Sequence, residues 1–506
     1  MFLLNFHSNN FRKAGFTGFF LFAFLLFPVT SFGNFDFNAN CLKAYEHILS
    51  LRLVTARQLI ANEKKLHPDN HIVPLLENYI DYFYLLTTES KSEFDRLKSN
   101  KDTRLDILED GNEESPYYLY AQAEVNLQWA LIRGRYGEYF AAAREIKKAN
   151  SQLLDNKSKF PAFHLNSKGL GVINAFLGNL PDGILKSTLS TLGIKGNLQA
   201  GINMLDKLAE NLPQSKYEPF YEEVIFYYSF VLNDIAHSPA AYSKVMKFTA
   251  RFSDSSLLKS YLQAMVSAKS GHNQEAIDIL SDRPSGQVYQ AYPYLDFLLA
   301  NAKLNKLDLT ATQDFNRFLQ LNKGVNYIKD TYLRLGWLAL LKGDTGLYTG
   351  FMKKTIASGY VYQEKDKQAL SEAKATIPDL RLLKARLLFD GGYFVAASEI
   401  LQKVPITGLA SLKDKTEYYY RSGRLNDELG KDDKAIAEYQ RSFDIGRTLP
   451  FYFAANAALQ MGKIYQAKGN TIKARQAFNA VLKMKNFEYE NSIKNQAKTA
   501  LNKLDK

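Results

Sequence analysis

The sequence predicts an all-α protein built from antiparallel helix hairpins that stack side by side. Apolar and small residues recur at i, i+3, i+4 and i+7 in segments of about 12–16 residues, the pattern of an amphipathic helix. Strand-like alternation is scarce, and the 506 residues include only 14 Pro and 29 Gly, which favours long regular elements. Short turns at 270–272, 429–431 and 468–470 separate neighbouring segments, so consecutive helices should run antiparallel.

The composition excludes several classes of protein. Apolar residues make up 46% and charged residues 23%, close to the average of a soluble globular protein. A wholly disordered chain, a collagen-like chain and a polytopic membrane protein are therefore excluded. A single cysteine excludes a disulfide framework and a Cys-rich zinc module. We interpret that residue, Cys41, as a small buried apolar side chain near the first helix.

The N-terminus has the features of an export signal. Arg12 and Lys13 precede the apolar run Ala14–Phe27, and Ser31–Gly33 supply small residues for a cleavage site. The run is shorter than the roughly 20 residues of a spanning helix, which favours cleavage over a retained anchor. We therefore expect a signal peptide over residues 1–33, a mature chain starting near Asn34, and a periplasmic or cell-envelope location. The alternative is an uncleaved N-terminal membrane anchor.

Three hairpins near the C-terminus share one register. Counted from a small residue in the first helix, a glycine follows after seven residues, an alanine after twelve, a large residue after sixteen and a smaller one after nineteen. The sets are Ala385, Gly392, Ala397, Leu401 and Val404; Gly423, Gly430, Ala435, Tyr439 and Ser442; and Gly462, Gly469, Ala474, Phe478 and Val481. Small residues let the two helices approach closely, and the large residue fills the hole between hairpins.

This small–large–small pattern resembles the tetratricopeptide repeat (TPR), and the resemblance implies a right-handed solenoid of helix hairpins. The small residues of the three first helices, Ala385, Gly423 and Gly462, are 38 and 39 residues apart, which exceeds the family period of about 34. Weaker copies precede the three strong ones. Their matching residues are Ala56, Ile60, Glu63 and Pro68; Ala264, Gly271, Ala276 and Leu280; and Gly336 and Gly343.

The segment near 158–210 departs from the repeat and predicts an irregular helical insert. It is rich in glycine, Pro181 should end a helix, and Asp182 can cap the next. Its order of motifs resembles a eukaryotic TPR family that includes an inclusion-body-clearance protein, and the resemblance covers about the first half of the mature chain. The residues that carry it are Gly171, Leu180-Pro181, Leu192-Gly193, Gly196-Asn197 and Gly201. We divide the chain into a signal peptide (1–33), an N-terminal helical region (34–215) and a TPR-like array (216–506).

No catalytic or cofactor site is recognisable in the sequence. It contains neither a nucleophile elbow nor a Walker-type loop. His67 and His71 have the spacing of metal ligands on a helix, but Pro68 between them indicates a turn. The paired carboxylates Glu222-Glu223 and Asp427-Glu428 are adjacent on expected helices, so each pair diverges rather than facing one substrate. We expect no enzyme activity, no cofactor and no metal.

One position on the first helices predicts a partner-binding groove. Directly after the small residue of the first helix, the three strong repeats carry Arg386, Arg424 and Lys463. Four residues before that position are Leu382, Tyr420 and Leu459. A basic row beside an apolar row suits an extended peptide or a protein tail of acidic character. The alternative is pairing of the arginines along the helix with Asp390, Asp427 or Glu428.

The C-terminal end is basic. Residues 450–506 include ten Lys and Arg and three Asp and Glu, which gives a net charge of +7. Such an end attracts anionic surfaces, although a solvated helix face is the simpler interpretation. The sequence therefore predicts an exported, non-catalytic TPR scaffold that binds a protein or extended peptide, with no nucleic acid expected. The alternative function is peripheral binding of an anionic membrane surface or polymer through the C-terminal end.

Overall fold

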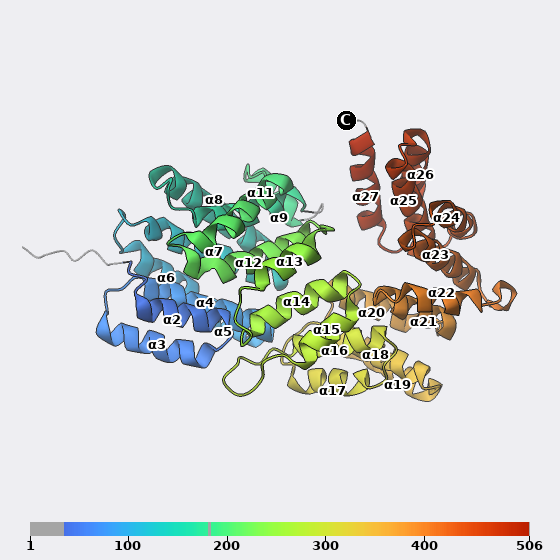
Figure 1. The fold of residues 1–506 in the computed structure, drawn as a ribbon, viewed down its shortest axis with the longest axis horizontal. Helices are drawn as coiled ribbons and strands as arrows, with labels where there is room; N and C mark the ends of the chain where they lie inside the picture. The colour runs from blue at the N-terminus through green and yellow to red at the C-terminus, as the bar shows by residue number, and fades with distance from the viewer. Residues whose placement is uncertain (1–34, 181–183, 505–506) are drawn as a thin grey trace, which may run out of the picture.

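The structure is a computed structural model that describes residues 35–180 and 184–504. The predicted signal peptide lies outside these residues, as do Pro181 and Asp182, to which the sequence assigns a helix end and a helix cap. Within the described residues every regular element is a helix and there is no strand. The protein is therefore all-α, as predicted, and its helices stack as hairpins along a solenoid (Figure 1).

The helices follow one another with short connections. The first half contains α2 (Ala39–Leu49), α3 (Leu53–Leu66), α4 (Ile72–Thr88), α5 (Lys91–Leu97), α6 (Asn100–Glu109), α7 (Pro116–Arg135), α8 (Tyr139–Lys159), α9 (Asn166–Gly178), α10 (Ile184–Thr191), α11 (Leu198–Asn211), α12 (Tyr221–Phe230) and α13 (Ala241–Thr249). Next come α14 (Leu257–Lys269), α15 (Asn273–Ser281), α16 (Tyr294–Asn305), α17 (Ala311–Leu321), α18 (Ile328–Leu341), α19 (Thr345–Ala357), α20 (Glu364–Lys374), α21 (Leu380–Asp390) and α22 (Phe394–Gln402). The last are α23 (Leu412–Glu428), α24 (Asp432–Gly446), α25 (Tyr452–Ala467), α26 (Thr471–Lys483) and α27 (Glu490–Leu504).

The arrangement of these helices is an open curve. Figure 1 shows α2–α13 gathered at one end, α14–α22 along the base, and α23–α27 rising at the other end toward the C-terminus. Each hairpin contacts the next, so helix packing continues along the curve, as in other stacked-repeat architectures. This leaves an inner surface that faces across the curve and an outer surface that faces solvent.

The small–large register predicted for the C-terminal hairpins is confirmed. The alanines at the shared position, Ala397, Ala435 and Ala474, are all fully buried. A Cβ added to Gly423 would lie 2.5 Å from the ring of Tyr439, so only glycine permits this approach of α23 and α24. The turn glycines of the three hairpins adopt positive φ angles of 78°, 68° and 72°, the conformation that glycine adopts without strain.

The register extends to one further hairpin, α7–α8. In α7–α8 the same spacing joins Ala130, Gly137, Ala142, Ile146 and Ala149, and the four side-chain-bearing positions are buried. Gly137 has a φ of 78°, like the C-terminal turn glycines. The spacing is present in the sequence, so this copy was open to recognition from the register alone.

The insert near 158–210 is helical, and glycines bring two of its helices into contact. A Cβ on Gly171 of α9 would lie 2.8 Å from Leu205 of α11. A Cβ on Gly201 of α11 would lie 2.5 Å from the backbone nitrogen of Ala175. The two helices therefore cross at backbone contact, a packing that no larger residue allows at these positions.

A buried ionic cluster joins five helices of the N-terminal region. The ammonium group of Lys168 on α9 lies 2.9 Å from the carboxylate of Glu124 on α7 and 2.5 Å from that of Glu223 on α12. The hydroxyl groups of Tyr45 on α2 and Tyr79 on α4 both donate hydrogen bonds to Glu223. All five side chains are almost completely excluded from solvent. The cluster replaces hydrophobic packing where these helices meet.

The hydrophobic core is not divided at the predicted boundary. The largest cluster of buried apolar side chains runs from Phe35 to Val325 and includes residues on both sides of 215/216. Smaller clusters follow along the C-terminal hairpins. The three-part division of the chain remains a prediction. Cys41 is buried in this first cluster, as expected.

Candidate functional site

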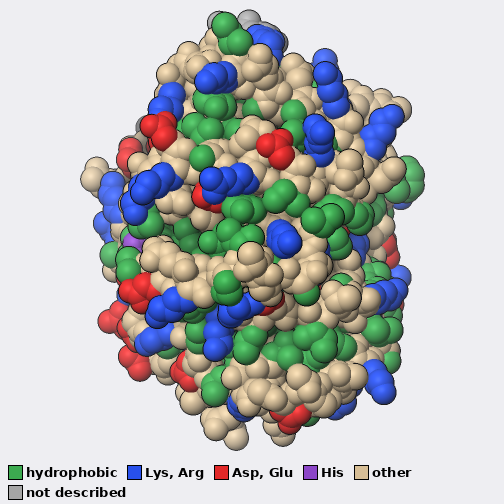
Figure 2. Space-filling model, turned by 90° about the vertical axis from the view of Figure 1, so that its right-hand side faces the viewer, with side chains coloured by type: hydrophobic (Ala, Val, Ile, Leu, Met, Phe, Trp, Pro, Cys, Tyr) green, Lys and Arg blue, Asp and Glu red, His purple; other side chains and the backbone are tan. Residues whose placement is uncertain are grey.

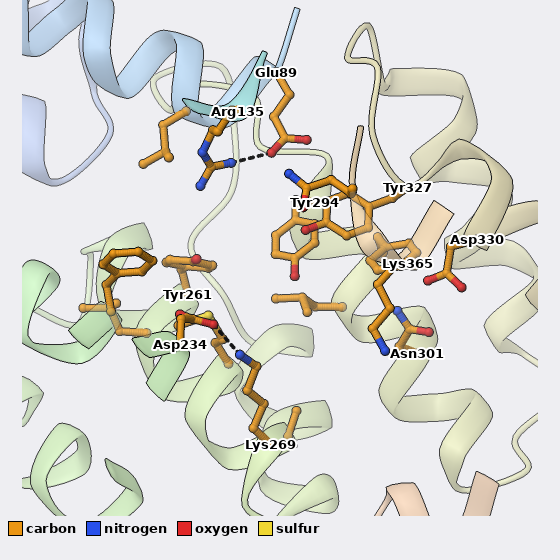
Figure 3. Close-up of a pocket in the computed structure, with 18 of the residues that line it drawn as sticks. Glu89, Arg135, Asp234, Tyr261, Lys269, Tyr294, Asn301, Tyr327, Asp330 and Lys365 are labelled. Carbon is orange, nitrogen blue, oxygen red and sulfur yellow. Dashed lines mark hydrogen bonds and ion pairs between the residues drawn. The ribbon is translucent and has the colours of Figure 1, made fainter. Parts of the chain in front are cut away.

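The inner surface of the solenoid contains a large cavity, which we call the tyrosine chamber. Its volume is about 1150 Å³, and four half-buried tyrosines line its centre: Tyr261, Tyr292, Tyr294 and Tyr327. Three of them are labelled in the close-up of Figure 3. The walls come from helices far apart in the sequence, from the end of α4 to α23. The chamber thus exists only because the solenoid curves back on itself.

Contacts across the curve close one side of the chamber. The loop before α18 reaches the C-terminal end of α4, where the backbone nitrogen of Val325 donates a 3.2 Å hydrogen bond to the carbonyl oxygen of Glu89. The Asn326 side chain donates a further hydrogen bond of 3.0 Å to the Glu89 carboxylate. The loop before α16 reaches the α2–α3 turn, where the backbone nitrogen of Gln290 donates to the carbonyl of Leu51 at 2.6 Å. The first loop therefore joins two elements that line the chamber, whereas the second joins the α2–α3 turn to the loop before α16 outside its lining.

The four tyrosines form a chain of neighbouring rings. Ring centroids are 5.3 Å apart between Tyr261 and Tyr292, 6.2 Å between Tyr292 and Tyr294, and 4.8 Å between Tyr294 and Tyr327. Burial is the main cause of a raised pKa at each of the four, and it brings that of Tyr261 to about 12. All four hydroxyl groups therefore stay protonated at neutral pH and can donate hydrogen bonds.

Ion pairs neutralise most of the charge on the chamber wall. Arg135 pairs with Glu89 at 2.6 Å, Lys269 pairs with Asp234, and Arg334 pairs with Asp330 at 3.0 Å; the first two pairs are drawn in Figure 3. These three carboxylates are therefore already engaged, whereas Asp390 on the same wall forms no ion pair with another described residue. These pairs leave the surface polar but without a net charge of either sign.

Several polar side chains of the wall have no such partner, and Lys365 and Asn301 are two of them. Lys365 of α20 makes no ion pair or hydrogen bond with another described residue. The surrounding protein, which displaces water, and then Arg334 lower its pKa. Asn301 of α16 faces the same space (Figure 3), and its buried side-chain oxygen accepts no hydrogen bond. Both groups are available to a ligand.

A second cavity, of about 830 Å³, continues along the C-terminal hairpins. It shares four lining residues with the tyrosine chamber: Lys365, Phe389, Asp390 and Arg424. We call the two cavities together the inner groove. Because they share a wall, one extended molecule can occupy both.

The predicted basic row lies partly on this groove. Arg386 and Arg424 line the second cavity, whereas Lys463 is exposed and lines neither cavity. Arg386 donates hydrogen bonds of 2.9 and 3.0 Å to the carboxylate of Glu372. Its guanidinium also lies 4.8 Å from the ring centroid of Trp337. Arg386 is therefore held by the protein itself, by an acid outside the three that the sequence offered as partners.

Arg424 and Lys463 are less firmly engaged. The guanidinium of Arg424 lies 4.8 Å from the ring centroid of Phe389. Its ion pair with Glu428, the helix-surface partner that the sequence suggested, is 3.4 Å long and therefore weaker than the pair of Arg386. Loss of hydration, followed by the charge of Arg424, lowers the pKa of Lys463. The two cations are thus close enough to affect each other. Partner binding by these residues remains a prediction.

The predicted apolar row is corrected at two of its three positions. Leu382 and Leu459 have exposed fractions of 1% and 0% and belong to the hydrophobic core, so neither faces the groove. Tyr420 is also largely buried, but it lines the second cavity. A position one turn before an inward-facing cation points toward the neighbouring helix, where an apolar side chain gains more by packing than by facing water.

Sequence reasoning missed the tyrosine chamber. Its residues do not share a repeat position, since Tyr292, Tyr294 and Tyr327 lie in or next to loops between hairpins. The one local indication is the cluster of aromatic residues in these loops, including Tyr360 and Tyr362 before α20. Their convergence on one cavity follows from the curvature of the whole array.

Two other features would bear on function: a metal site and a membrane-spanning helix. No group of three or more His, Cys, Asp or Glu side chains in them has the arrangement of a metal site. The His67 side chain contacts Glu63 at 3.0 Å, and that of His71 contacts the backbone carbonyl of Asp69 at 2.9 Å. In the same part of the chain, none of the helices combines the length and hydrophobicity required to span a bilayer.

Comparisons with known proteins identify repeats at the C-terminal end. The family model of the tetratricopeptide repeat matches residues 416–445 and 455–487, which correspond to α23–α24 and α25–α26. No curated protein matches the chain.

Two solved structures are among those similar to the chain. One is a chain of the APC/C hetero-tetramer Cut9–Hcn1, with 13% identity, 92% of this chain and 96% of that chain covered, and a TM-score of 0.26. The other is the TPR domain of P58(IPK), with 14% identity, 81% and 97% covered, and a TM-score of 0.22. These TM-scores are too low to support an argument, so the assignment depends on the family match and the buried register. The chain therefore contains tetratricopeptide repeats, which the family model matches over α23–α24 and α25–α26.

Proposed function

We propose that this protein is an exported, non-catalytic scaffold that holds an extended segment of a partner protein in its inner groove. The observation that carries this proposal is the continuity of the groove, whose two cavities share Lys365, Phe389, Asp390 and Arg424. Stacked-repeat proteins typically use such concave surfaces for binding. Aromatic rings, the unpaired amide oxygen of Asn301 and the ammonium group of Lys365 on the wall supply contacts that a peptide needs.

The proposal is tested by reversing charge where the two cavities meet. We expect Lys365→Glu combined with Arg424→Glu to abolish capture of the partner by tagged protein purified from the native envelope. The matched control is Lys483→Glu combined with Lys498→Glu, which alters two exposed lysines outside the groove. Circular dichroism checks that both proteins keep their helicity. Equal capture by the two double variants would overturn the proposal.

Export is part of the same proposal. It is supported by the charged and apolar segments that precede Ser31–Gly33 in the sequence. The N-terminal residue of protein purified from its native cells should lie near Asn34, and the protein should appear in the periplasmic or envelope fraction. A mature chain that begins at Met1 and stays in the membrane would instead support the N-terminal anchor.

A second candidate function is peripheral binding of an anionic surface. Lys483, Lys485, Lys498 and Lys503 are exposed and form no ion pair with another described residue. Figure 2, which views the molecule from the side of the C-terminal hairpins, has Lys and Arg side chains spread over the face with hydrophobic ones between them. Salt-sensitive sedimentation with vesicles containing anionic lipid, lost in Lys483→Glu with Lys498→Glu, would favour this function.

A further inference from the structure

We propose that the tyrosine chamber binds an uncharged, proline-rich segment of the partner protein. This inference rests on the proposed function, because it specifies the chemistry of the segment that the inner groove holds. Three properties of the chamber support it: its balance of charge, the arrangement of its tyrosines, and the hydrogen-bonding groups that its wall leaves free.

The charge balance of the chamber disfavours a charged segment. Ten ionisable Lys, Arg, Asp and Glu side chains line it, five of each sign. Eight of them form ion pairs with each other, and the remaining two, Lys365 and Asp390, are opposite in sign. A charged segment entering the chamber would lose hydration without gaining an unopposed counter-charge. An uncharged segment avoids this cost.

The tyrosines offer ring faces in series. Tyr261, Tyr292, Tyr294 and Tyr327 form a run of rings with centroid separations between 4.8 and 6.2 Å. At the margin of the chamber, Tyr360 and Tyr362 stack at 5.4 Å with exposed fractions of 56% and 43%. Grooves lined by aromatic rings accept proline side chains, which lie flat against the rings, and the polyproline II conformation is already formed before binding.

The free polar groups of the wall match a backbone that offers carbonyl groups without N–H groups. The hydroxyl groups of Tyr261 and Tyr292 hydrogen-bond each other, as do those of Tyr294 and Tyr327, so each pair keeps one free O–H donor. The ammonium group of Lys365 donates no hydrogen bond to another described residue. Most of the wall carboxylates, which would accept from a backbone N–H, are held by Arg135, Lys269 and Arg334. A proline residue has a carbonyl acceptor and no N–H donor, so burying it leaves no donor unsatisfied.

The same occupied carboxylates disfavour a sugar. Sugar hydroxyl groups act as donors as well as acceptors, and recognising them requires free acceptors beside the aromatic rings. Asn301 and Asp390 supply free acceptors, but the other four carboxylates of the chamber wall are held in ion pairs. The continuation of the groove into the second cavity also fits an extended polypeptide.

The test measures binding of fluorescein-labelled decaproline to the mature chain by fluorescence anisotropy. Comparison peptides of equal length are a Gly-Ser repeat, a Pro-Glu repeat and a Pro-Lys repeat, and unlabelled chitohexaose serves as a competitor. We expect saturable binding of decaproline, weaker binding of both charged repeats, and no displacement by the sugar. Absence of saturable binding, equal binding of the Gly-Ser repeat, or displacement by chitohexaose would overturn the inference.

Variants locate the binding in the chamber. Tyr294→Phe combined with Tyr327→Phe removes two hydroxyl donors and keeps the rings, so we expect decaproline to bind roughly tenfold more weakly. The matched control is Tyr419→Phe, a half-buried tyrosine of α23 that lines neither cavity. Tyr362→Ser, in the exposed loop, is a second variant that leaves the core unchanged and should also weaken binding. Unaltered affinity in both chamber variants would contradict the inference.

Failure of this inference is distinguishable from failure of the proposed function. If partner capture depends on Lys365 and Arg424 while decaproline does not bind, the groove holds a segment of other chemistry and only the inference fails. If partner capture is indifferent to those two residues, the proposed function itself fails.

Discussion

The side-chain amide of Asn326 donates a 3.0 Å hydrogen bond to the carboxylate of Glu89, which lies 237 residues earlier in the chain. The same carboxylate pairs with Arg135 at the end of α7, and the backbone carbonyl of Glu89 accepts from Val325. One residue therefore connects the end of α4, the end of α7 and the loop before α18. This connection turns a curved array into a chamber.

The first prediction concerns this connection. Glu89→Ala should open the contact between the loop at 322–327 and α4, and it should lower the free energy of unfolding by about 1–3 kcal/mol because Arg135 loses its partner. Hydrogen–deuterium exchange should rise at 322–327 and at the end of α7. Glu113→Ala, an exposed acid in the α6–α7 loop, is the control and should change neither. Unchanged exchange at 322–327 in the Glu89 variant would show that the contact does not hold the chamber closed.

The second prediction tests the repeat register. Gly423→Ala places a Cβ 2.5 Å from the Tyr439 ring and should destabilise the protein by roughly 1–3 kcal/mol. Gly350→Ala, in the middle of α19, meets nothing within 4 Å and should stabilise by about 0.5–1 kcal/mol through helix propensity. Urea unfolding of the two variants gives the comparison. Equal effects of the two substitutions would contradict the packing at this register position.

The third prediction concerns Glu63, a buried acid that accepts hydrogen bonds from Asn38 and Asn40 near the start of the described residues. Burial acts to raise its pKa, but hydrogen bonds from Asn40, Asn70, Asn38 and His67 outweigh it and lower the pKa to about 2. The folded pKa is below the unfolded value, so the stabilisation is present above about pH 4.5 and is lost as the pH falls toward 2. Glu63→Gln should lower the free energy of unfolding by a few kcal/mol at neutral pH and should reduce the loss of stability between pH 4.5 and pH 2. If the variant loses stability over this pH range as much as the parent protein does, the assignment is wrong.

The fourth prediction concerns the buried ionic cluster. Burial raises the pKa of Glu124 to about 7, although Lys168 opposes the shift. Because the folded protein binds this proton more tightly than the unfolded chain, stability should rise as the pH falls from 7 toward 4.5 and decline as the pH rises through 7. Glu124→Gln should remove that dependence.

The central cation of the same cluster gives a stronger test of its packing. Lys168→Met leaves two buried carboxylates without a countercharge and should cost about 3–5 kcal/mol. Thermal unfolding measured at several pH values reports both changes. A Lys168→Met variant as stable as the parent at pH 8 would mean that the cluster is not buried as described.

The sequence was a good guide to local structure. The spacing from Gly462 through Gly469 and Ala474 to Phe478 depends on the contact of two helices joined by a tight turn, and short-range patterns record such contacts. The copy at Ala130–Ala149 obeys the same spacing, although its neighbours in the array do not repeat at a fixed period. Local register was therefore predictable, and the distance between repeats was not.

The site was less predictable, for physical reasons. The sequence predicts that Arg424 lies on the groove, because helix geometry fixes its direction relative to the neighbouring small residue Gly423. The same reasoning fails for Leu382, whose side chain points into the core. The sequence does not reveal where groove-facing positions of a helix give way to core-facing ones. Tyr294 and Tyr327 meet only through the curvature of the whole array, which no local pattern encodes.

Photo-cross-linking in native cells tests the central claim most directly. With p-benzoylphenylalanine at Tyr362, which lines the chamber, irradiation should give one discrete adduct with a partner protein. With the same residue at Ile472, which is 72% exposed on α26 and lines neither cavity, it should give none. Adducts at Ile472 with none at Tyr362 would contradict the account, because the partner would then bind the outer surface.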